Sequence, residues 1–457
     1  MQTAEDYKRL AKKCPEAAMV RAALEHSLQP DLLEEMFEDC RTSQYTHELA
    51  FSVLIKLLHE VVSRNRPSVN SAYTLHEAEI GVSKKAVYDK LNATDPSVSE
   101  GLVRYTAERV RDVIDELGVH SPSVILGYRT RIIDGNQFAA TEHRLKELRR
   151  VGSGPLPGKA LAVWDGERSM VSNVYCCEDG HAQERRILLE VVNDVEAGEL
   201  WIADRNFAVS WFAWEIHNSK AFFIFRRHKR NIRLRSMGEE RYVGDSETGK
   251  VYEEAVAIED DFGNEFIARK IRIVLHSPTG DGDKEIELLS NLPANVSAVA
   301  IAEAYRTRWR IETAFFELDR LFEGEIRALA HPRAALLMFC LSLVAYNALK
   351  LTRAALAAVH GKESEQQLSE YYFSQVVVSD WRALEVHLPP TYWSNRFGNC
   401  TPRALASELK SLAKNVNMSR LRKTTRGPKK PRPKRSSAKN KPHVSTYRLL
   451  RESGRIK

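Results

Sequence analysis

The chain has 457 residues, of which 43% are hydrophobic and 28% charged, and its formal net charge is +7. This length allows about two to four domains with a sizeable core, and the composition is that of an ordinary soluble protein. The first residues lack the pattern of a secretory signal, and the six cysteines form no C-x-x-C pair, so neither a zinc site nor a disulfide framework is indicated. We therefore expect a cytoplasmic protein without a membrane partner.

The positive charge is concentrated near the C-terminus. Residues 420–443 contain eleven Lys or Arg and no carboxylate, so the rest of the chain is mildly acidic. We expect residues 419–457 to form a basic, disordered tail, because this composition cannot bury a core. The tail is either a binding segment for phosphate backbones or a solvated linker with incidental charge. The candidate phosphate-binding residues are Arg422, Lys423, Lys429 and Lys430.

Residues 1–120 alternate helical patterns with short breaks. The apolar residues in 32–37 and 49–62 predict two amphipathic helices. Ser97-Val-Ser-Glu100 matches a capping box and predicts a further helix that ends near Gly118.

A possible helix-turn-helix lies within this region, at residues 75–91. The sequence predicts one helix, a turn at Gly81, and a second helix that starts at Ser83. Lys84 and Lys85 would then be able to face a DNA groove. Many all-helical domains contain such a turn without touching DNA, so the motif alone leaves both interpretations open.

Strand patterns begin near residue 124. A short apolar run ends in Asp134 and Gly135, which predicts that Asp134 lies at a strand terminus, although Asp-Gly is more often only a turn. Residues 160–164 and 171–175 predict two further strands. Glu184 then reads as a carboxylate at a helix start.

A second acidic residue follows an apolar strand. Residues 200–203 lead directly into Asp204, and a helix is predicted at 209–217. An Asp that caps this helix would be the ordinary explanation. Residues 230–292 then read as strands and turns before the next helix.

The segment Tyr305–Leu321, Y-R-T-R-W-R-I-E-T-A-F-F-E-L-D-R-L, predicts one amphipathic helix. Tyr305, Arg308 and Glu312 share a face at the edge of its apolar stripe. Taken alone, this face could be a solvated salt bridge. The apolar residues 334–351 predict a buried helix, because the segment is short for a membrane span and carries polar side chains.

The spacing Tyr305-x-x-Arg308-x-x-x-Glu312, with Trp309 inside it, resembles the signature of the insertion-sequence-four family. These are bacterial cut-and-paste DNA transposases with a DDE triad. The resemblance covers about residues 120–350 and is weaker outside them. Its other blocks are Asp134-Gly-Asn-Gln-Phe138 with 141–149, Asp179–Arg185, and Asp204-Arg-Asn-Phe207. One departure is Asp319, where the family has a basic residue; Arg320 follows it and could take that role.

The resemblance implies that Asp134, Asp204 and Glu312 are catalytic carboxylates that bind two Mg²⁺ ions, for which Mn²⁺ can substitute. Mg²⁺ prefers oxygen ligands and keeps several waters, so three carboxylates suffice. Two such ions can hold the attacking and leaving oxygens of an in-line displacement at phosphorus. The expected DNA contacts of the signature are Tyr305, Arg308, Trp309 and Arg320.

The implied fold is α/β, a ribonuclease-H-like core with an inserted β domain, a helical N-terminal DNA-binding region and C-terminal helices. The implied partners are double-stranded DNA, as terminal inverted repeats and as target, and a second copy of the chain in a synaptic complex near the nucleoid. The alternatives are an inactive DNA-binding relative or a metal-dependent nuclease that does not join strands. The expected divisions are 1–120 (DNA binding), 121–229 and 293–352 (core), 230–292 (inserted β domain), 353–418 (C-terminal helices) and 419–457 (tail).

Overall fold

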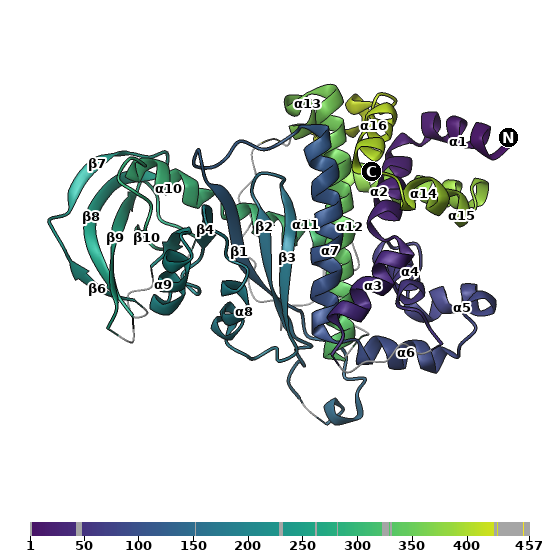
Figure 1. Cartoon of the computed structure of the whole chain (residues 1–457), viewed down its shortest axis with the longest axis horizontal. Coiled ribbons are helices and arrows are strands. Elements are labelled where there is room, and N and C mark those ends of the chain that lie inside the picture. The colour runs from purple at the N-terminus through teal and green to yellow at the C-terminus, as the bar shows by residue number, and fades with distance from the viewer. Residues whose placement is uncertain are drawn as a thin grey trace. The chain divides into compact units, whose positions relative to one another are not determined.

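The structure is a computed structural model in which residues 2–42, 48–150, 152–227, 232–260, 263–280, 282–321, 329, 331–424, 427 and 451 are described. The chain divides into two compact units, Met1–Arg422 and Lys423–Lys457. All helices and strands named below belong to the first unit (Figure 1).

Helices precede, interrupt and follow a mixed sheet. The first helices are α1 (Gln2–Lys13), α2 (Pro15–Ser27), α3 (Pro30–Cys40), α4 (Phe51–Val62), α5 (Val69–Ile80), α6 (Lys84–Ala93) and α7 (Pro96–Leu117). The strands are β1 (Arg129–Gln137), β2 (Lys159–Asp165), β3 (Met170–Cys177), β4 (Glu199–Ala203), β5 (Phe222–Arg226), β6 (Arg233–Ser236), β7 (Arg241–Asp245), β8 (Gly249–Glu259), β9 (Glu265–Leu275) and β10 (Glu285–Ser290). The remaining helices are η1 (Lys146–Leu148), η2 (Glu184–Arg186), α8 (Leu188–Val192), α9 (Ser210–Asn218), α10 (Ala298–Arg306), α11 (Trp309–Leu321), α12 (Pro332–His360), α13 (Lys362–Gln366), α14 (Glu370–His387), α15 (Pro390–Trp393), η3 (Ser394–Gly398), α16 (Pro402–Ala413) and η4 (Met418–Leu421).

The described strands form one sheet in the order β3-β2-β1-β4-β5-β10-β9-β8-β6, and β7 pairs with β8. β1, β2 and β3 are antiparallel neighbours, whereas β4 and β5 extend the sheet in parallel with β1. The strands of segment 230–292 continue this same sheet, because β10 pairs antiparallel with β5. Asp204 therefore follows a central strand of the sheet.

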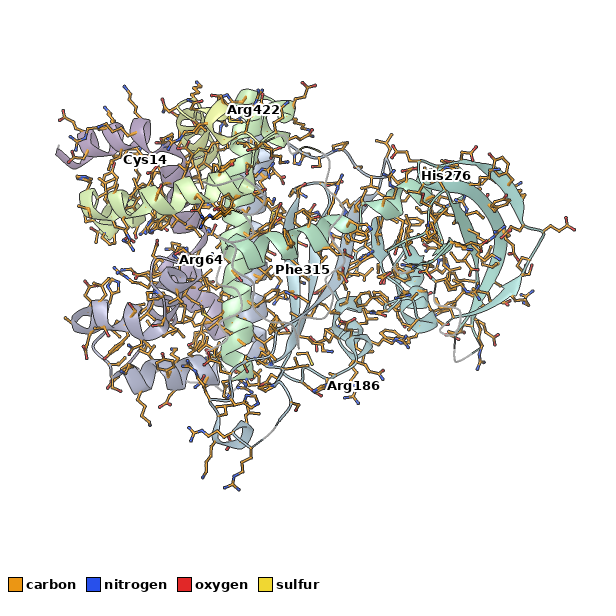
Figure 2. All side chains as sticks on the ribbon, turned by 180° about the vertical axis from the view of Figure 1, so that it is seen from behind. Cys14, Arg64, Arg186, His276, Phe315 and Arg422 are labelled. Atoms are coloured by element: carbon orange, nitrogen blue, oxygen red, sulfur yellow. The ribbon has the colours of Figure 1, made fainter. Side chains whose placement is uncertain are left out.

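Helices cover both faces of the sheet. Ile132 and Ile202 belong to a core shared with α7, α10, α11 and α12, whereas their neighbours Ile133 and Ala203 pack toward α8 and α9. Successive side chains of a strand point to opposite faces, so this alternation fixes which face each sheet residue joins. Figure 2 shows α11, marked by Phe315, lying across the sheet.

The long helix α12 is a core helix. It has the length and hydropathy that a membrane span needs, but 94% of its most apolar window is buried inside the protein. The polar Asn347 is also buried, and it bonds the backbone of Val171 on β3 through both its oxygen and its nitrogen. The prediction of a buried helix here is confirmed.

The helix-turn-helix elements are confirmed as local structure. α5 ends at Gly81, which adopts a left-handed conformation with φ of 71°. Such a φ suits glycine because it has no Cβ. The Ser83 hydroxyl then accepts the N–H of Ala86 at 3.2 Å and caps α6.

The capping-box prediction was wrong in detail. α7 begins at Pro96 with Asp95 as its N-cap residue, because proline favours the first helical position. Ser97 instead donates to the carbonyl of Cys40 at 2.7 Å, and Glu100 accepts the N–H of Cys176 at 2.7 Å. These two side chains join α7 to a neighbouring helix and to β3.

The signature segment is two helices rather than one. α10 ends at Arg306 and α11 starts at Trp309. Between them, the Thr307 hydroxyl bonds the Ala304 carbonyl at 2.7 Å and the Arg308 N–H bonds the Tyr305 carbonyl. These tighter bonds break the regular helical pattern, which periodicity alone did not predict.

Candidate active site

Asp134 and Asp204 lie side by side at the sheet. β1 and β4 are parallel, and Ile133 pairs with Ala203 in register. The next residues are Asp134 and Asp204, and neighbouring strands are about 4.8 Å apart. The two carboxylates are therefore brought together by strand register, although 69 residues separate them in the chain.

The two predictions for these residues had different outcomes. Asp204 directly follows β4, as predicted, and it does not cap α9, whose N-cap residue is Val209. The prediction that Asp134 ends its strand was wrong, since β1 continues to Gln137. Asp134 stays paired opposite Ala162, because β2 is long enough to hold the strand extended beyond the Asp-Gly step.

Glu312 approaches from the helical layer on the same face. Asp134 and Asp204 lie two residues after Ile132 and Ile202, which pack under α10 and α11. Glu312 is in the first turn of α11, and Ile311 beside it is completely buried. The edge of the apolar stripe of α11, where Glu312 lies, therefore faces the two acidic residues.

Arg308 joins Asp134 to Glu312. One guanidinium nitrogen, Nη1, lies 3.1 Å from Asp134 Oδ2 and 2.6 Å from Glu312 Oε1. Arg308 is only 6% exposed, and its Nε has no hydrogen-bond partner among the described residues. The pairing of this buried arginine with Asp134 was not predicted from the sequence, because the two residues are 174 positions apart in the chain.

Tyr305 contacts the remaining acidic residue. Its hydroxyl donates to Asp204 Oδ1 at 3.2 Å, and its ring is buried. Burial, followed by the charge of Asp204, raises the pKa of Tyr305, so the hydroxyl keeps its proton and remains a donor. The next aromatic residue of the signature, Trp309, is 63% exposed and stands near the Arg308 guanidinium.

Burial gives Asp134 an unusual affinity for protons. Desolvation raises its pKa to about 7, the Arg308 charge and the Gly135 N–H oppose this shift, and the charges of Glu312 and Asp204 add to it. Three acidic groups in one partly buried place repel each other unless a cation is present. A pKa of this size marks a group whose charge depends on its partner.

The donor set fits a divalent cation, but the present arrangement holds an arginine instead. Carboxylate oxygens are the ligands that Mg²⁺ prefers. Among the described residues, no three Asp, Glu, His or Cys side chains are already placed to hold a metal ion together. Arg308 lies between Asp134 and Glu312, so metal binding by both requires its guanidinium to move.

Arg226 and Gly135 are neighbours of the acidic residues in the sheet. Arg226 follows Phe225, the partner of Ala203, so it lies beside Asp204 on β5. It donates to Asp283 at 2.6 Å. On the other side, Gly135 packs against Glu184: a Cβ at this position would lie 2.6 Å from Glu184 Oε1, so a larger residue would require the Glu184 side chain to move. Glu184 starts η2, as its sequence context predicted.

The other predicted DNA contacts are Lys84, Lys85, Arg320, Arg422, Lys423, Lys429 and Lys430. Lys84 and Lys85 are exposed at the start of α6, and Arg422 is exposed after η4. Lys423 belongs to the second unit. The side chains of Arg320 and Asp319, and residues Lys429 and Lys430, lie outside the described residues. Their proposed contacts stay predictions.

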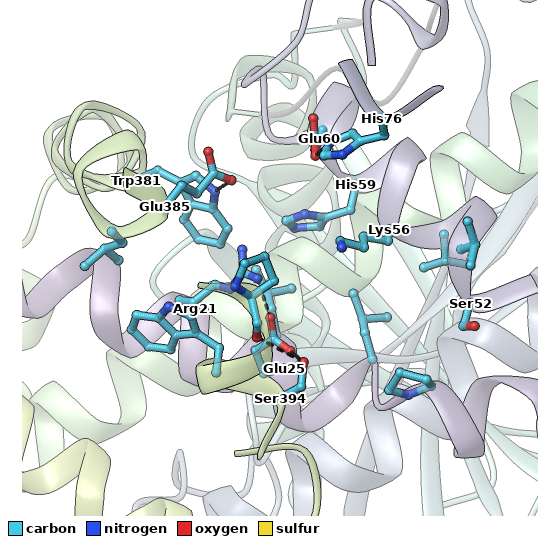
Figure 3. A pocket seen from close by; sticks show the side chains of 18 of the residues that line it. Arg21, Glu25, Ser52, Lys56, His59, Glu60, His76, Trp381, Glu385 and Ser394 are labelled. Carbon is cyan, nitrogen blue, oxygen red and sulfur yellow. Dashed lines mark hydrogen bonds and ion pairs between the residues drawn. The ribbon is translucent and has the colours of Figure 1, made fainter. Parts of the chain in front are cut away.

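The positions of two cavities can be compared with those of the acidic residues. One of about 850 Å³ lies between the β8–β10 strands and the α10–α11 junction, and Tyr305 and Trp309 line it. Another of about 420 Å³ lies among the helices, around Arg21, His59 and Trp381 (Figure 3). None of Asp134, Asp204 and Glu312 lines either cavity, and the second cavity belongs to the helical layer.

Comparison with known proteins points to one class. Residues 125–348 match the family model described as a transposase DDE domain, and this span contains Asp134, Asp204 and Glu312. The match supports a DDE transposase, a DNA-cleaving class of enzyme whose domains use divalent metal ions.

Among solved structures, the chain is similar to a piggyBac transposase in a synaptic complex with hairpin DNA, determined by cryo-electron microscopy. The identity is 13%, the alignment covers 83% of this chain and 84% of that one, and the TM-score is 0.36. No curated protein sequence matches the chain significantly.

Proposed function

We propose that this protein is a DNA transposase of the insertion-sequence-four type, which binds the ends of its mobile element and catalyses DNA strand cleavage and strand transfer. The observation that carries the proposal is the convergence of three acidic residues from separate segments. Asp134 and Asp204 meet through the register of β1 and β4, and Glu312 is tied to Asp134 through Arg308. All three lie inside the segment that matches the transposase domain.

The sheet supports the proposal of a ribonuclease-H-like core. β3, β2 and β1 form an antiparallel meander, and β4 and β5 extend it in parallel with helices on both faces. We propose that 121–229 and 293–352 form this core around the inserted segment 230–292. The helical region 1–120, the helices of 353–418 and the tail from 419 then serve DNA binding and assembly.

Asp134, Asp204 and Glu312 would hold two Mg²⁺ or Mn²⁺ ions. When bound, such ions supply activation of the attacking oxygen and stabilisation of the leaving oxygen at phosphorus. Asp134 must lose its proton to act as a ligand, whereas the Tyr305 hydroxyl orients Asp204 by its hydrogen bond. Arg308, once displaced from the carboxylates, is placed to bind a DNA phosphate bidentately.

Trp309 would stack on an unpaired base, because its indole ring is exposed beside the acidic residues. The substrate in this proposal is double-stranded DNA, first the inverted repeats of the element and then the target. Two ends must be held together for joining, which favours a homodimer on DNA.

The test is strand cleavage and joining by the full-length protein on a labelled duplex that carries the inverted repeats flanking its gene. With Mg²⁺ or Mn²⁺ we expect cleavage at the repeat boundary and transfer to a second duplex. Cleavage without joining would favour the nuclease alternative. Retained end binding without any cleavage would favour the inactive DNA-binding alternative, and neither binding nor cleavage would refute the proposal.

A further inference from the structure

The connection between β1 and β2 carries an excess of exposed positive charge. Its segment Glu142–Arg150 contains four Lys or Arg and two Glu. Arg144 pairs with Glu142 at 2.7 Å. In the described part of the chain, no ion pair is found for Lys146, Arg149 or Arg150, and all three are exposed.

This connection has a defined local structure. The N–H of Thr141 donates to the Pro155 carbonyl at 2.9 Å, so the outgoing and returning arms are joined near the base. Further out, the His143 ring bonds the Ser153 carbonyl at 3.1 Å. The short helix η1 forms the tip and includes Lys146. The charges are therefore presented on a folded loop rather than on a linker.

The loop adjoins the second helix of the helix-turn-helix. It lies at the lower edge of Figures 1 and 2, next to α6. Burial raises the pKa of Tyr88 on α6, and the Arg144 charge opposes this shift, so the two side chains are near each other. Lys84 and Lys85 precede Tyr88 by four and three positions and therefore share its helix face.

Two cations of α6, Lys84 and Lys85, are weakly engaged. Lys84 Nζ donates to the neutral Asn70 at 2.9 Å. Lys85 approaches Asp89 at 3.3 Å, but the Lys85 side chain is 88% exposed, and a pair this exposed contributes little. Their charge remains available to an anion that approaches from solvent.

The loop also begins close in sequence to Asp134. β1 leads from Asp134 to Gln137 and then directly into the loop. A polyanion bound along α6 and the loop would therefore lie on the segment that continues the strand of Asp134. Exposed arginines and lysines without acidic partners favour phosphates, whose binding releases counterions from the nucleic acid.

We propose that the β1–β2 loop, through Lys146, Arg149 and Arg150, and the exposed face of α6, through Lys84 and Lys85, form one cationic surface that binds the phosphate backbone of duplex DNA. The loop residues of this surface position the duplex and do not read its sequence. This inference rests on the proposed function and names where that function's substrate lies.

The test is the affinity of the full-length protein for a random-sequence duplex, measured by fluorescence anisotropy over a range of salt concentrations. Lys146→Ala with Arg149→Ala and Arg150→Ala should weaken binding by roughly tenfold or more at low salt. It should also lower the slope of log affinity against log salt by about 0.9 for each lost contact.

Two control variants make the result specific. Lys8→Ala with Lys12→Ala and Lys13→Ala removes the same charge from exposed positions on α1, far from the loop in Figure 1, and should leave the affinity nearly unchanged. Lys146→Arg with Arg149→Lys and Arg150→Lys keeps the charge and should keep the binding. Thermal unfolding of each variant shows whether it is folded.

The outcomes separate this inference from the function on which it rests. Equal weakening by the loop and α1 variants would mean that only net charge matters and would overturn the surface. Normal binding by the loop variant would overturn it too, while cleavage of element ends by the parent would still support a transposase. A parent that binds no duplex would overturn both.

Discussion

Arg308 is the residue on which the metal-free arrangement depends. Its guanidinium neutralises Asp134 and Glu312 and occupies the space between them. A buried carboxylate that loses its only cation is strongly destabilised, so the arginine contributes to folding before any metal binds. The same contact competes with a metal ion for the two carboxylates.

We expect Arg308→Gln to lower the melting temperature without metal and to enlarge the increase that Mn²⁺ produces. The variant removes both the counter-charge and the competitor. Differential scanning fluorimetry with and without Mn²⁺ measures both effects. Arg306→Gln is the matched control, because Arg306 pairs with Glu247 and Glu303 outside the acidic group. An unchanged Mn²⁺ effect in Arg308→Gln would contradict the competition.

Glu312→Gln should abolish cleavage and leave DNA binding intact. The amide keeps the size of the side chain but removes an anionic ligand, and disabling one such electrostatic element costs on the order of a hundredfold or more in rate. Asp134→Asn and Asp204→Asn should behave alike, and combining them should cost little more, because the three act as a unit. Cleavage of a labelled end and a gel shift on the same samples check this. Full cleavage by Glu312→Gln would refute the site assignment.

The raised pKa of Asp134 predicts a pH dependence of stability. The group takes up its proton near pH 7 when folded, against an ordinary value of 3.8. Between these values the folded state binds more protons than the unfolded state, so the free energy of unfolding of the metal-free protein should fall as pH rises from about 4 to about 7. Asp134→Asn should flatten this part of the curve in urea unfolding. An Asn variant with the parent's full pH dependence would show that other groups cause it.

At the scale of elements, the α10–α11 junction shows what sequence periodicity misses. The apolar stripe predicted both helices, and Ile301, Ile311 and Leu318 are indeed buried. At the break, the Thr307 hydroxyl bonds the Ala304 carbonyl, and Arg308 pairs with Asp134. The second of these contacts joins residues 174 positions apart, which no local pattern contains.

Strand register is the second feature that could not be predicted from the sequence. The sequence indicated strands before Asp134 and Asp204, yet it could not show that Ile133 pairs with Ala203. The family resemblance predicted the roles of the three acidic residues, whereas the sheet register explains why Asp134 and Asp204 lie close together. The Asp-Gly step was misread as a turn because the extended pairing with β2 is a non-local contact.

The α6 helix carries a prediction of its own. Lys84→Ala with Lys85→Ala should reduce the preference for element ends over random duplex, because the second helix of a helix-turn-helix reads the major groove. Footprinting over an end, with affinity for random duplex measured in parallel, separates recognition from charge. Lys12→Ala with Lys13→Ala on α1 is the charge-matched control. A footprint identical to that of the parent would place recognition elsewhere.

At the scale of the whole chain, the first unit ends at Arg422. η4 packs its Leu421 completely inside, and the Leu421 carbonyl accepts the N–H of Ser369 at 2.8 Å. Residues 419–422 are therefore part of the folded body in structural terms. The basic pattern in the sequence begins at Arg420, whereas the folded unit ends only at Arg422. Arg420 and Arg422 therefore carry their charge on a packed turn.

Ending the chain after Arg422 should weaken binding to all DNA, lower the salt slope by about 0.9 per lost phosphate contact, and leave the melting temperature unchanged. Ending it after Ser419 should in addition lower the melting temperature, since Leu421 is lost from the core. Salt titrations by anisotropy and thermal unfolding of the two truncations test this. An unchanged salt slope would contradict a role of the tail in DNA binding.

The pairing of β5 with β10 has an evolutionary consequence. The chain continues from Arg226 at the end of β5 into the β6–β9 strands and returns with Leu288 directly opposite Arg226. The segment between is closed at its base by backbone hydrogen bonds. Lengthening a loop that is already closed costs little entropy. Descendants of this chain can therefore gain or lose residues in the turns of the β6–β9 segment while the β5–β10 pairing stays closed, whereas β7, β8 and β9 are constrained because α10 packs on them.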